Sequence, residues 1–295
     1  MSQAVPARVF PGRLERFAST GSTNDIVRAW LANGTPEVCA AVAEEQTEGR
    51  GRHGRAWTAP PGVALLCSLG FRPTWLEPER AWRLAGIVAL AMCDAAEDTA
   101  GLPVGAVRLK WPNDLVVETA GPYALLTGDL VPEVARARLA APLELRKLAG
   151  ILGESEGLGT DDPRVVVGIG INADWAEEDF PPDIAPTMTS LRHASAGRPI
   201  DREALLESFL DHLDARLAAL RAGYFDIAAW AGRQATTGRL VTLESGDGSA
   251  SAPRLAVGVD GATGALVLED DQAGGGERRV HAGEVVRVRL VPPEV

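Results

Sequence analysis

The feature that most constrains this 295-residue chain is a run of alternating glycines and arginines beside two apolar segments. Residues 49–55 read Gly-Arg-Gly-Arg-His-Gly-Arg, after an apolar stretch at 38–44 and before another at 63–71. Glycines allow tight turns and bring backbone N–H groups close to an anion, and arginines offer charged forks for carboxylate or phosphate. We predict an ordered anion-binding loop between two strands. A disordered RNA-binding tail is less favoured, because the cluster is single and lies well inside the chain.

Charge and composition exclude several classes of protein. A hydrophobic content of 46% supports a packed core, and a net charge of −11 argues against duplex DNA as the main partner. Cys39, Cys67 and Cys93 are widely spaced in apolar surroundings, which indicates buried thiols rather than disulfides. Cysteine and histidine never cluster at zinc-ligand spacing.

The sequence also bears on location. No apolar signal core precedes Phe17, and the apolar stretch 84–93 is too short to span a bilayer. We therefore expect a cytoplasmic protein with no membrane partner.

Three polar motifs are each weak when taken alone. Ser22-Thr23-Asn24 is a candidate helix cap, Lys110-Trp-Pro-Asn-Asp predicts a tight turn between two strands, and Lys147 enters an apolar strand. Each has an ordinary structural explanation, since capping residues, Pro-Asn-Asp turns and strand-end lysines are common. Residues 168–173 also match G-x-G-x-x-A, but no helix is predicted after them, so we reject a dinucleotide fingerprint.

The pattern of elements predicts a large unit followed by a small one. Helices are expected over 79–99 and 201–222, and residues 118–146 are read as an inserted surface loop. From about residue 236, short apolar segments alternate with Gly-rich turns, which predicts a small antiparallel barrel. We therefore divide the chain into residues 1–235 and residues 236–295.

In this order along the chain, five motifs closely resemble those of the biotin protein ligases. They are Ser22-Thr23-Asn24, Gln46 before Gly-Arg-Gly-Arg-x-Gly-Arg, Lys-Trp-Pro-Asn-Asp, Lys-Leu-Ala-Gly-Ile-Leu and Gly-Ile-Gly-Ile-Asn. The resemblance covers residues 17–290. It implies an α+β fold, with a mixed sheet flanked by helices similar to class II aminoacyl-tRNA synthetase cores, and a C-terminal SH3-like β-barrel.

The resemblance also implies an activity. Such enzymes use ATP and Mg²⁺ to convert biotin to biotinyl-5′-adenylate, and then transfer biotin to one lysine of a biotin carboxyl carrier domain. The implied protein is a monomer or a homodimer. The alternative functions for this chain are those of a lipoate or octanoate ligase, a biotin-responsive DNA-binding regulator, and a catalytically silent biotin-binding protein.

The resemblance assigns roles to particular residues. Lys147 and Arg52 are the expected catalytic residues, and Asp114 is the expected Mg²⁺ ligand. The biotin-binding set is Ser22, Thr23, Asn24, Gln46, Gly49, Arg50, Gly51, Arg52, Lys147 and Gly150. The nucleotide-binding set is Arg52, Arg55, Trp57, Lys110, Asn113, Asp114, Lys147 and Asn172.

Three departures from the family pattern stand out. His53 occupies a position that is usually basic, so its charge depends on pH. The 118–146 segment is longer than expected. No helix-turn-helix region precedes Ser22, so we expect no DNA partner and a monofunctional enzyme.

Overall fold

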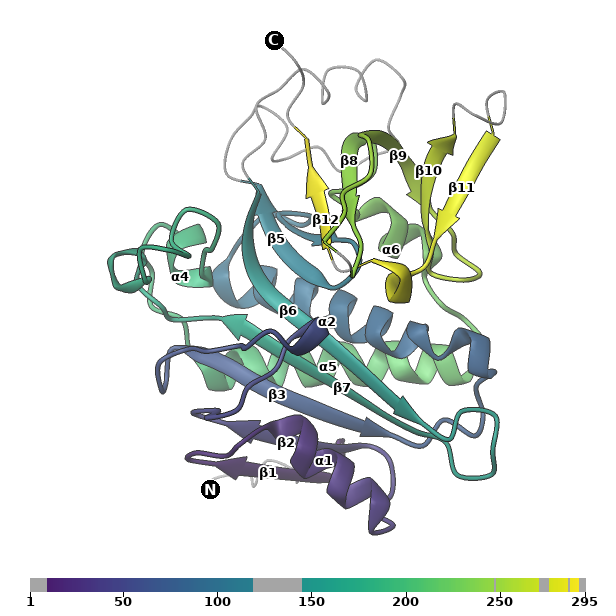
Figure 1. Cartoon of the computed structure of the whole chain (residues 1–295). Coiled ribbons are helices and arrows are strands. Elements are labelled where there is room, and N and C mark those ends of the chain that lie inside the picture. The colour runs from purple at the N-terminus through teal and green to yellow at the C-terminus, as the bar shows by residue number, and fades with distance from the viewer. Residues whose placement is uncertain (1–9, 119–144, 247, 271–275, 286, 292–295) are drawn as a thin grey trace, which may run out of the picture.

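The computed structural model describes residues 10–118, 145–246, 248–270, 276–285 and 287–291. Within these ranges the chain forms two sheets, one with seven strands and one with five (Figure 1). The predicted insertion lies outside the described residues between positions 119 and 144.

The larger sheet is mixed, and its strands run in the order β1-β2-β3-β7-β6-β5-β4. The bounds are β1 (Arg13–Phe17), β2 (Cys39–Ala43), β3 (Ala64–Phe71), β4 (Val107–Lys110), β5 (Asp114–Glu118), β6 (Leu145–Glu156) and β7 (Arg164–Asn172). Strands β1 and β2 are parallel, and every other pair in this sheet is antiparallel. The predicted mixed sheet with helices is therefore confirmed.

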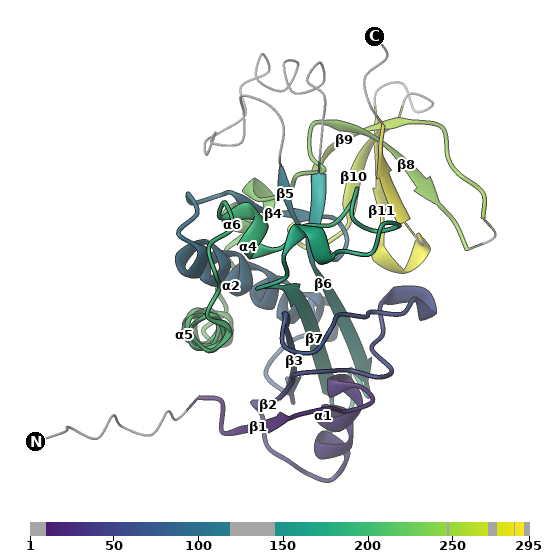
Figure 2. The ribbon, with the colours of Figure 1, turned by 90° about the vertical axis from the view of Figure 1, so that its left-hand side faces the viewer.

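Two long helices cover one face of this sheet, and a shorter one lies on the other face (Figures 1 and 2). The helices are α1 (Thr23–Ala32), α2 (Trp82–Ala100), α4 (Leu191–Ala194), α5 (Arg202–Arg221) and α6 (Ile227–Gly232). Helices α2 and α5 pack together over the main hydrophobic core, as their periodic apolar positions predict. None of the helices in the described part of the chain is long and apolar enough to cross a membrane.

Side-chain alternation assigns the two faces of the central strands different roles. Val165, Val167, Ile169 and Ile171 of β7 belong to the core beneath α2 and α5. The intervening Gly168 and Gly170 face the side of α1, and an added Cβ at Gly168 would lie 2.2 Å from Asn24 Oδ1. This face therefore lets polar and aromatic groups approach the backbone closely.

The predicted turn of Lys-Trp-Pro-Asn-Asp is confirmed. It joins β4 to β5, which pair in antiparallel register from Val107↔Val117 to Lys110↔Asp114. Pro112 has no N–H to donate to a ladder, so a turn is the position that suits it. The turn brings Lys110 and Asp114 opposite each other at one edge of the sheet.

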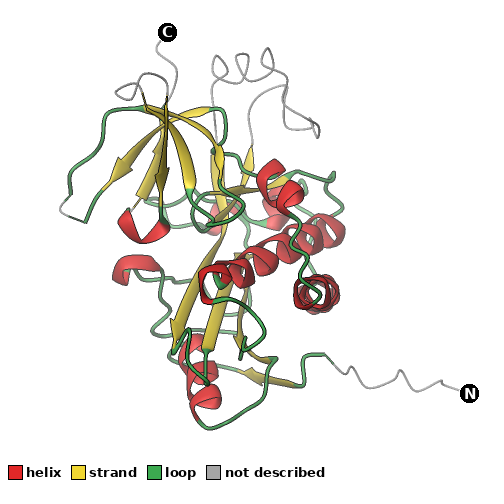
Figure 3. Ribbon diagram, turned by 90° about the vertical axis from the view of Figure 1, so that its right-hand side faces the viewer, coloured by secondary structure: helices red, strands yellow, loops and turns green. Residues whose placement is uncertain are grey.

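The second sheet is antiparallel, with the order β11-β10-β9-β8-β12. Figure 3 shows its strands grouped above those of the larger sheet. Its bounds are β8 (Arg239–Glu244), β9 (Arg254–Val259), β10 (Leu266–Asp270), β11 (Gly276–Val280) and β12 (Arg287–Leu290). Its own core receives Trp111 from the turn between β4 and β5. Buried Glu118 also joins the two parts, because it pairs with Arg108 and with Arg239 at 3.5 and 2.9 Å.

Candidate active site

The Gly/Arg loop is an ordered hairpin-like turn. Trp57 N donates to Gly49 O at 2.9 Å, and Gly51 N donates to Arg55 O at 2.7 Å. Glycine is required at position 49, because an added Cβ would lie 2.3 Å from the carbonyl oxygen of Trp57. At the tip, His53 has a left-handed φ of 56°, a conformation that few residues other than glycine adopt.

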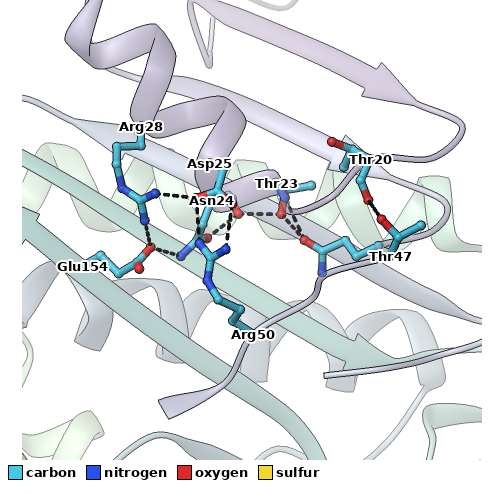
Figure 4. A network of polar contacts seen from close by, with 10 residues as sticks. Thr20, Thr23, Asn24, Asp25, Arg28, Thr47, Arg50 and Glu154 are labelled. Carbon is cyan, nitrogen blue, oxygen red and sulfur yellow. Dashed lines mark hydrogen bonds and ion pairs between the residues drawn. The ribbon is translucent and has the colours of Figure 1, made fainter. Parts of the chain in front are cut away.

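Ser22 to Asn24 begin α1 beside a polar cluster that is mostly buried (Figure 4). Ser22 takes the N-cap position, but its side chain makes no capping hydrogen bond among the described residues. Thr23 Oγ1 lies 2.7 Å from Ser68 Oγ, which donates to Asn24 Oδ1 at 2.6 Å. Capping by side chains therefore does not explain why these residues occur together.

Gln46 has a defined orientation in this cluster. The backbone N–H of Thr23 donates to Gln46 Oε1 at 2.8 Å, and an N–H can donate only to the oxygen of an amide. The hydroxyl of Thr23 also lies 2.9 Å from the same oxygen. The NH₂ group of Gln46 is therefore the end available as a donor to a ligand.

Trp57 lies across the glycine face of the sheet. Its Nε1 would be 2.6 Å from a Cβ added at Gly170, and its ring would be 3.2 Å from one added at Gly150. Lys147 Nζ lies 5.3 Å from the centre of the same ring. The indole N–H is buried against Gly170 and has no hydrogen-bond partner in the described residues.

Lys147 is the best-placed cation of the site. Its Nζ lies 2.6 Å from Asp114 Oδ1, across the paired strands β6 and β5. Its backbone is fixed on the other side, since Lys147 N donates to Thr187 O and Thr189 N donates to Lys147 O. A rigid backbone at the end of a strand holds the ammonium where it can meet an anion.

Arg52 reaches from the loop to the C-terminal part of the chain. Its Nη2 donates to the carbonyls of Ala282 and Val285, and His53 Nε2 lies 3.2 Å from Val285 O. Its Nη1 is buried and has no partner among the described residues. Burial, and then the charge of Arg55, lower the pKa of Arg52 from its usual value.

These elements enclose two adjoining cavities. The smaller, of about 120 Å³, lies at the polar cluster, and the larger, of about 480 Å³, lies toward α2 and the second sheet. Arg52, Asn113, Ile151 and Leu152 line both. From the predicted set, the smaller cavity is lined by Ser22, Thr23, Asn24, Gln46, Arg50, Gly51, Arg52, Arg55, Trp57, Asn113, Lys147 and Gly150.

The remaining predicted residues are nearby but placed differently. Lys110 and Asp114 line the larger cavity. Gly49 closes the base of the loop. Asn172 is buried at the end of β7, where its Nδ2 donates to Thr189 O and its Oδ1 has no partner in the described ranges. Neither Gly49 nor Asn172 lines either cavity.

Sequence reasoning missed four residues that support the site. Ser68 is a single, fully buried hydroxyl in the apolar strand β3, and that isolation was its only signal in the sequence. Asp25, Arg28 and Glu154 form ion pairs around the loop (Figure 4). Arg50 was expected to face a ligand carboxylate, and in this structure both of its terminal nitrogens donate to Asp25.

More than half of the sequence matches a known protein family. The model of the biotin/lipoate A/B protein ligase family matches residues 17–172, which is more than half of the chain. The chain belongs to this family.

Two relatives resemble the chain over most of its length. A biotin–[acetyl-CoA-carboxylase] ligase of Mycobacterium tuberculosis is 32% identical over 280 residues, covering 94% of this chain and 90% of that protein. A protein of the same name from Paracoccus denitrificans is 31% identical, covering 85% and 92%.

Solved structures share the fold. The biotin protein ligase of Aquifex aeolicus in complex with biotin and ATP aligns with a TM-score of 0.70 at 23% identity, covering 95% of this chain and 99% of that one. The biotin protein ligase of Leishmania major in complex with biotinyl-5-AMP aligns with a TM-score of 0.58 at 22% identity, covering 92% and 100%.

Proposed function

We propose that the chain is an ATP-dependent biotin protein ligase. It forms biotinyl-5′-AMP from biotin and ATP and transfers the biotinyl group to a lysine of a biotin carboxyl carrier domain. The observation that carries this proposal is the position of Lys147, which lines the smaller, polar cavity together with Arg50 and Arg52 of the loop and pairs with Asp114 of the larger cavity. Membership of the ligase family, and relatives named for this activity, support it.

The smaller cavity suits the ureido head group of biotin. Gln46 lines it, with the NH₂ group as the uncommitted end of its amide, and Ser22 and Asn24 line it as well. A ureido group has both donors and an acceptor to match these groups. The dithiolane of lipoate has no N–H or carbonyl, so it would leave buried polar groups unmatched at a cost of roughly 1–3 kcal/mol each. This contrast favours biotin over lipoate.

The first half-reaction brings two anions together. A carboxylate oxygen of biotin attacks the α-phosphorus of ATP, the bond from that phosphorus to the bridging oxygen breaks, and pyrophosphate leaves. Lys147 bridges the carboxylate and the α-phosphate, and the free Nη1 of Arg52 stabilises charge on the phosphate. Arg52 is held in place by its bonds to Ala282 and Val285, whereas Lys147 exchanges Asp114 for the substrate anions.

The nucleotide occupies the larger cavity. Lys110, Asn113 and Asp114 line it, and Asn113 and Arg52 also line the biotin cavity, to which Arg55 and Trp57 belong. We assign Mg²⁺ to the carboxylate of Asp114, because Mg²⁺ commonly takes one or two carboxylates together with substrate phosphates. When bound, Mg²⁺ neutralises phosphate charge. Asn172 lines neither cavity and supports the backbone of Lys147 through Thr189.

In the second half-reaction the acceptor lysine amine attacks the acyl carbon of the adenylate. An amide bond forms, the bond to the phosphate oxygen breaks, and AMP leaves. Water competes for the same anhydride, so the 49–55 loop has to exclude it.

The finer features of the molecule are part of the same proposal. We assign residues 1–235 to a catalytic domain resembling class II synthetase cores and residues 236–295 to an SH3-like barrel. The enzyme is cytoplasmic, acts as a monomer or a homodimer, and binds no DNA.

The test is exchange of labelled pyrophosphate into ATP with biotin or lipoate present. Biotin-dependent exchange, followed by labelling of a purified carrier domain, is the expected result. Exchange with lipoate and none with biotin would show that lipoate, and not biotin, is the substrate. Binding of biotin without any exchange would indicate a catalytically silent biotin-binding protein. The variant Arg52→Gly is expected to release the adenylate faster than the wild type does.

A further inference from the structure

Arg50 anchors the 49–55 loop to helix α1 through a two-pronged ion pair. Its Nη1 and Nη2 each donate at 2.7 Å to a different oxygen of Asp25. Arg50 also forms an isolated bridge with Ala56 in the returning half of the loop. One arginine therefore connects both halves of the loop with the first turn of a helix that packs on the sheet.

The pair continues into a chain of charged and polar contacts (Figure 4). Asp25 also binds Arg28, whose Nη2 donates to Glu154 Oε2 at 2.6 Å. The same oxygen accepts from Asn24 Nδ2 at 2.7 Å. Glu154 on β6 therefore connects the anchor of the loop to an amide that lines the biotin cavity.

The arrangement is stronger than an isolated surface pair. Two carboxylates and two guanidiniums balance in charge, and the Asp25–Arg50 contact is bidentate. The hydrogen bond from Arg50 is the largest influence that lowers the pKa of Asp25, so its carboxylate stays ionised at neutral pH. The side chains are 41% and 35% exposed, and solvent therefore limits the strength of the contact.

We propose that Asp25 is a positioning residue that holds the 49–55 loop closed over the acyl-adenylate through Arg50, with Glu154 fixing the helix side of this anchor. The inference rests on the proposed ligase function. Neither cavity is lined by Asp25, so it acts on the adenylate through its partners and not by direct contact. Weakening the anchor opens the loop more often, and this raises the loss of adenylate to water more than it slows adenylate formation.

The test compares Asp25→Asn, Arg50→Gln and the double variant. Enzyme loaded with biotinyl-adenylate is chased without ATP, and loss of the adenylate is followed in time; pyrophosphate exchange is measured in parallel. We expect Asp25→Asn to lose adenylate about fivefold faster, with exchange at saturating biotin changed less than twofold. The double variant is expected to match Arg50→Gln, because the two side chains act through one contact.

Glu203→Gln is the matched control. It removes the exposed partner of Arg16, which it binds at 2.7 Å in a similar pair between β1 and α5. Adenylate loss in this control is expected to match the wild type.

The outcomes separate the two proposals. Unchanged adenylate loss in Asp25→Asn, or effects of Asp25 and Arg50 that simply add, would overturn the positioning role. If pyrophosphate exchange and adenylate retention fell equally, Asp25 would act in the chemistry itself, and this result would also overturn the positioning role. Absence of biotin-dependent exchange in the wild type would instead refute the ligase function.

Discussion

The ammonium of Lys147 and the carboxylate of Asp114 are 2.6 Å apart on adjacent antiparallel strands. Without a ligand the pair neutralises itself. A bound carboxylate and phosphate would compete with Asp114 for the ammonium and free that carboxylate to face a metal ion. In the proposed adenylation step, the same two strands would supply both the cation for the substrates and the anion for the metal ion.

Lys147→Ala is expected to lower the rate of adenylate formation by about 10²–10³, the usual cost of removing one donor that stabilises transition-state charge. Pyrophosphate exchange measures it directly. Arg146→Ala is the control, because that neighbouring side chain points instead to Glu177 at 3.0 Å. Equal activity of the two variants would remove Lys147 from its assigned role.

Gly168→Ala is expected to weaken biotin binding by roughly tenfold or more. The added methyl would lie 2.2 Å from Asn24 Oδ1 and 3.2 Å from Ser68 Oγ, and it would force apart a buried hydrogen bond. Titration calorimetry with biotin measures the effect. Gly258→Ala is the control, since this strand glycine has nothing within 4 Å of an added Cβ. Unaltered affinity for Gly168→Ala would contradict the placement of the head group.

The turn after β9 offers a prediction about pH. The hydrogen bond from Arg279, followed by those from the backbone of Thr263 and Ala262, lowers the pKa of Asp260 to about 2. A lowered carboxyl pKa stabilises the folded state fully above the unfolded value near ~4, and the contribution is lost as the pH falls toward the folded value. We expect Asp260→Asn to lower Tm by about 2 °C at pH 7, with the difference shrinking below pH ~4. A difference that stays constant on acidification, measured by thermal unfolding, would argue against this assignment.

Much of the fold was predictable because local chemistry and tertiary structure agree. The apolar face of residues 201–222 became α5, with Asp201 capping it through the N–H groups of Glu203 and Ala204. The segments at 38–44 and 63–71 became β2 and β3, and the three cysteines are buried as expected.

Other elements carry no sequence signal of their own. Strand β1 has the half-exposed sequence Arg-Leu-Glu-Arg-Phe, and β11 is mostly charged, so only pairing with β2 and with β10 makes them strands. The six-residue α6 was missed because it is too short to show a period.

The candidate site, like the fold, was only partly predictable from the sequence. Its motifs could be read along the chain, and the structure brings most of their residues to one cavity. The partner of Arg50 could not be predicted from the sequence, because Asp25 lies 25 positions away and only the packing of α1 brings it to the loop. Ser68 could not be recognised either, since a single serine in an apolar strand has no pattern.

The contact of Arg52 with Ala282 and Val285 has a consequence for biosynthesis. These partners lie 230 and 233 positions beyond the arginine. A nascent chain whose first sheet has already folded therefore still lacks the carbonyls that receive this arginine. The loop gains these two contacts only once residues up to Val285 have emerged from the ribosome, so a shorter nascent chain holds the loop less firmly than the finished fold does.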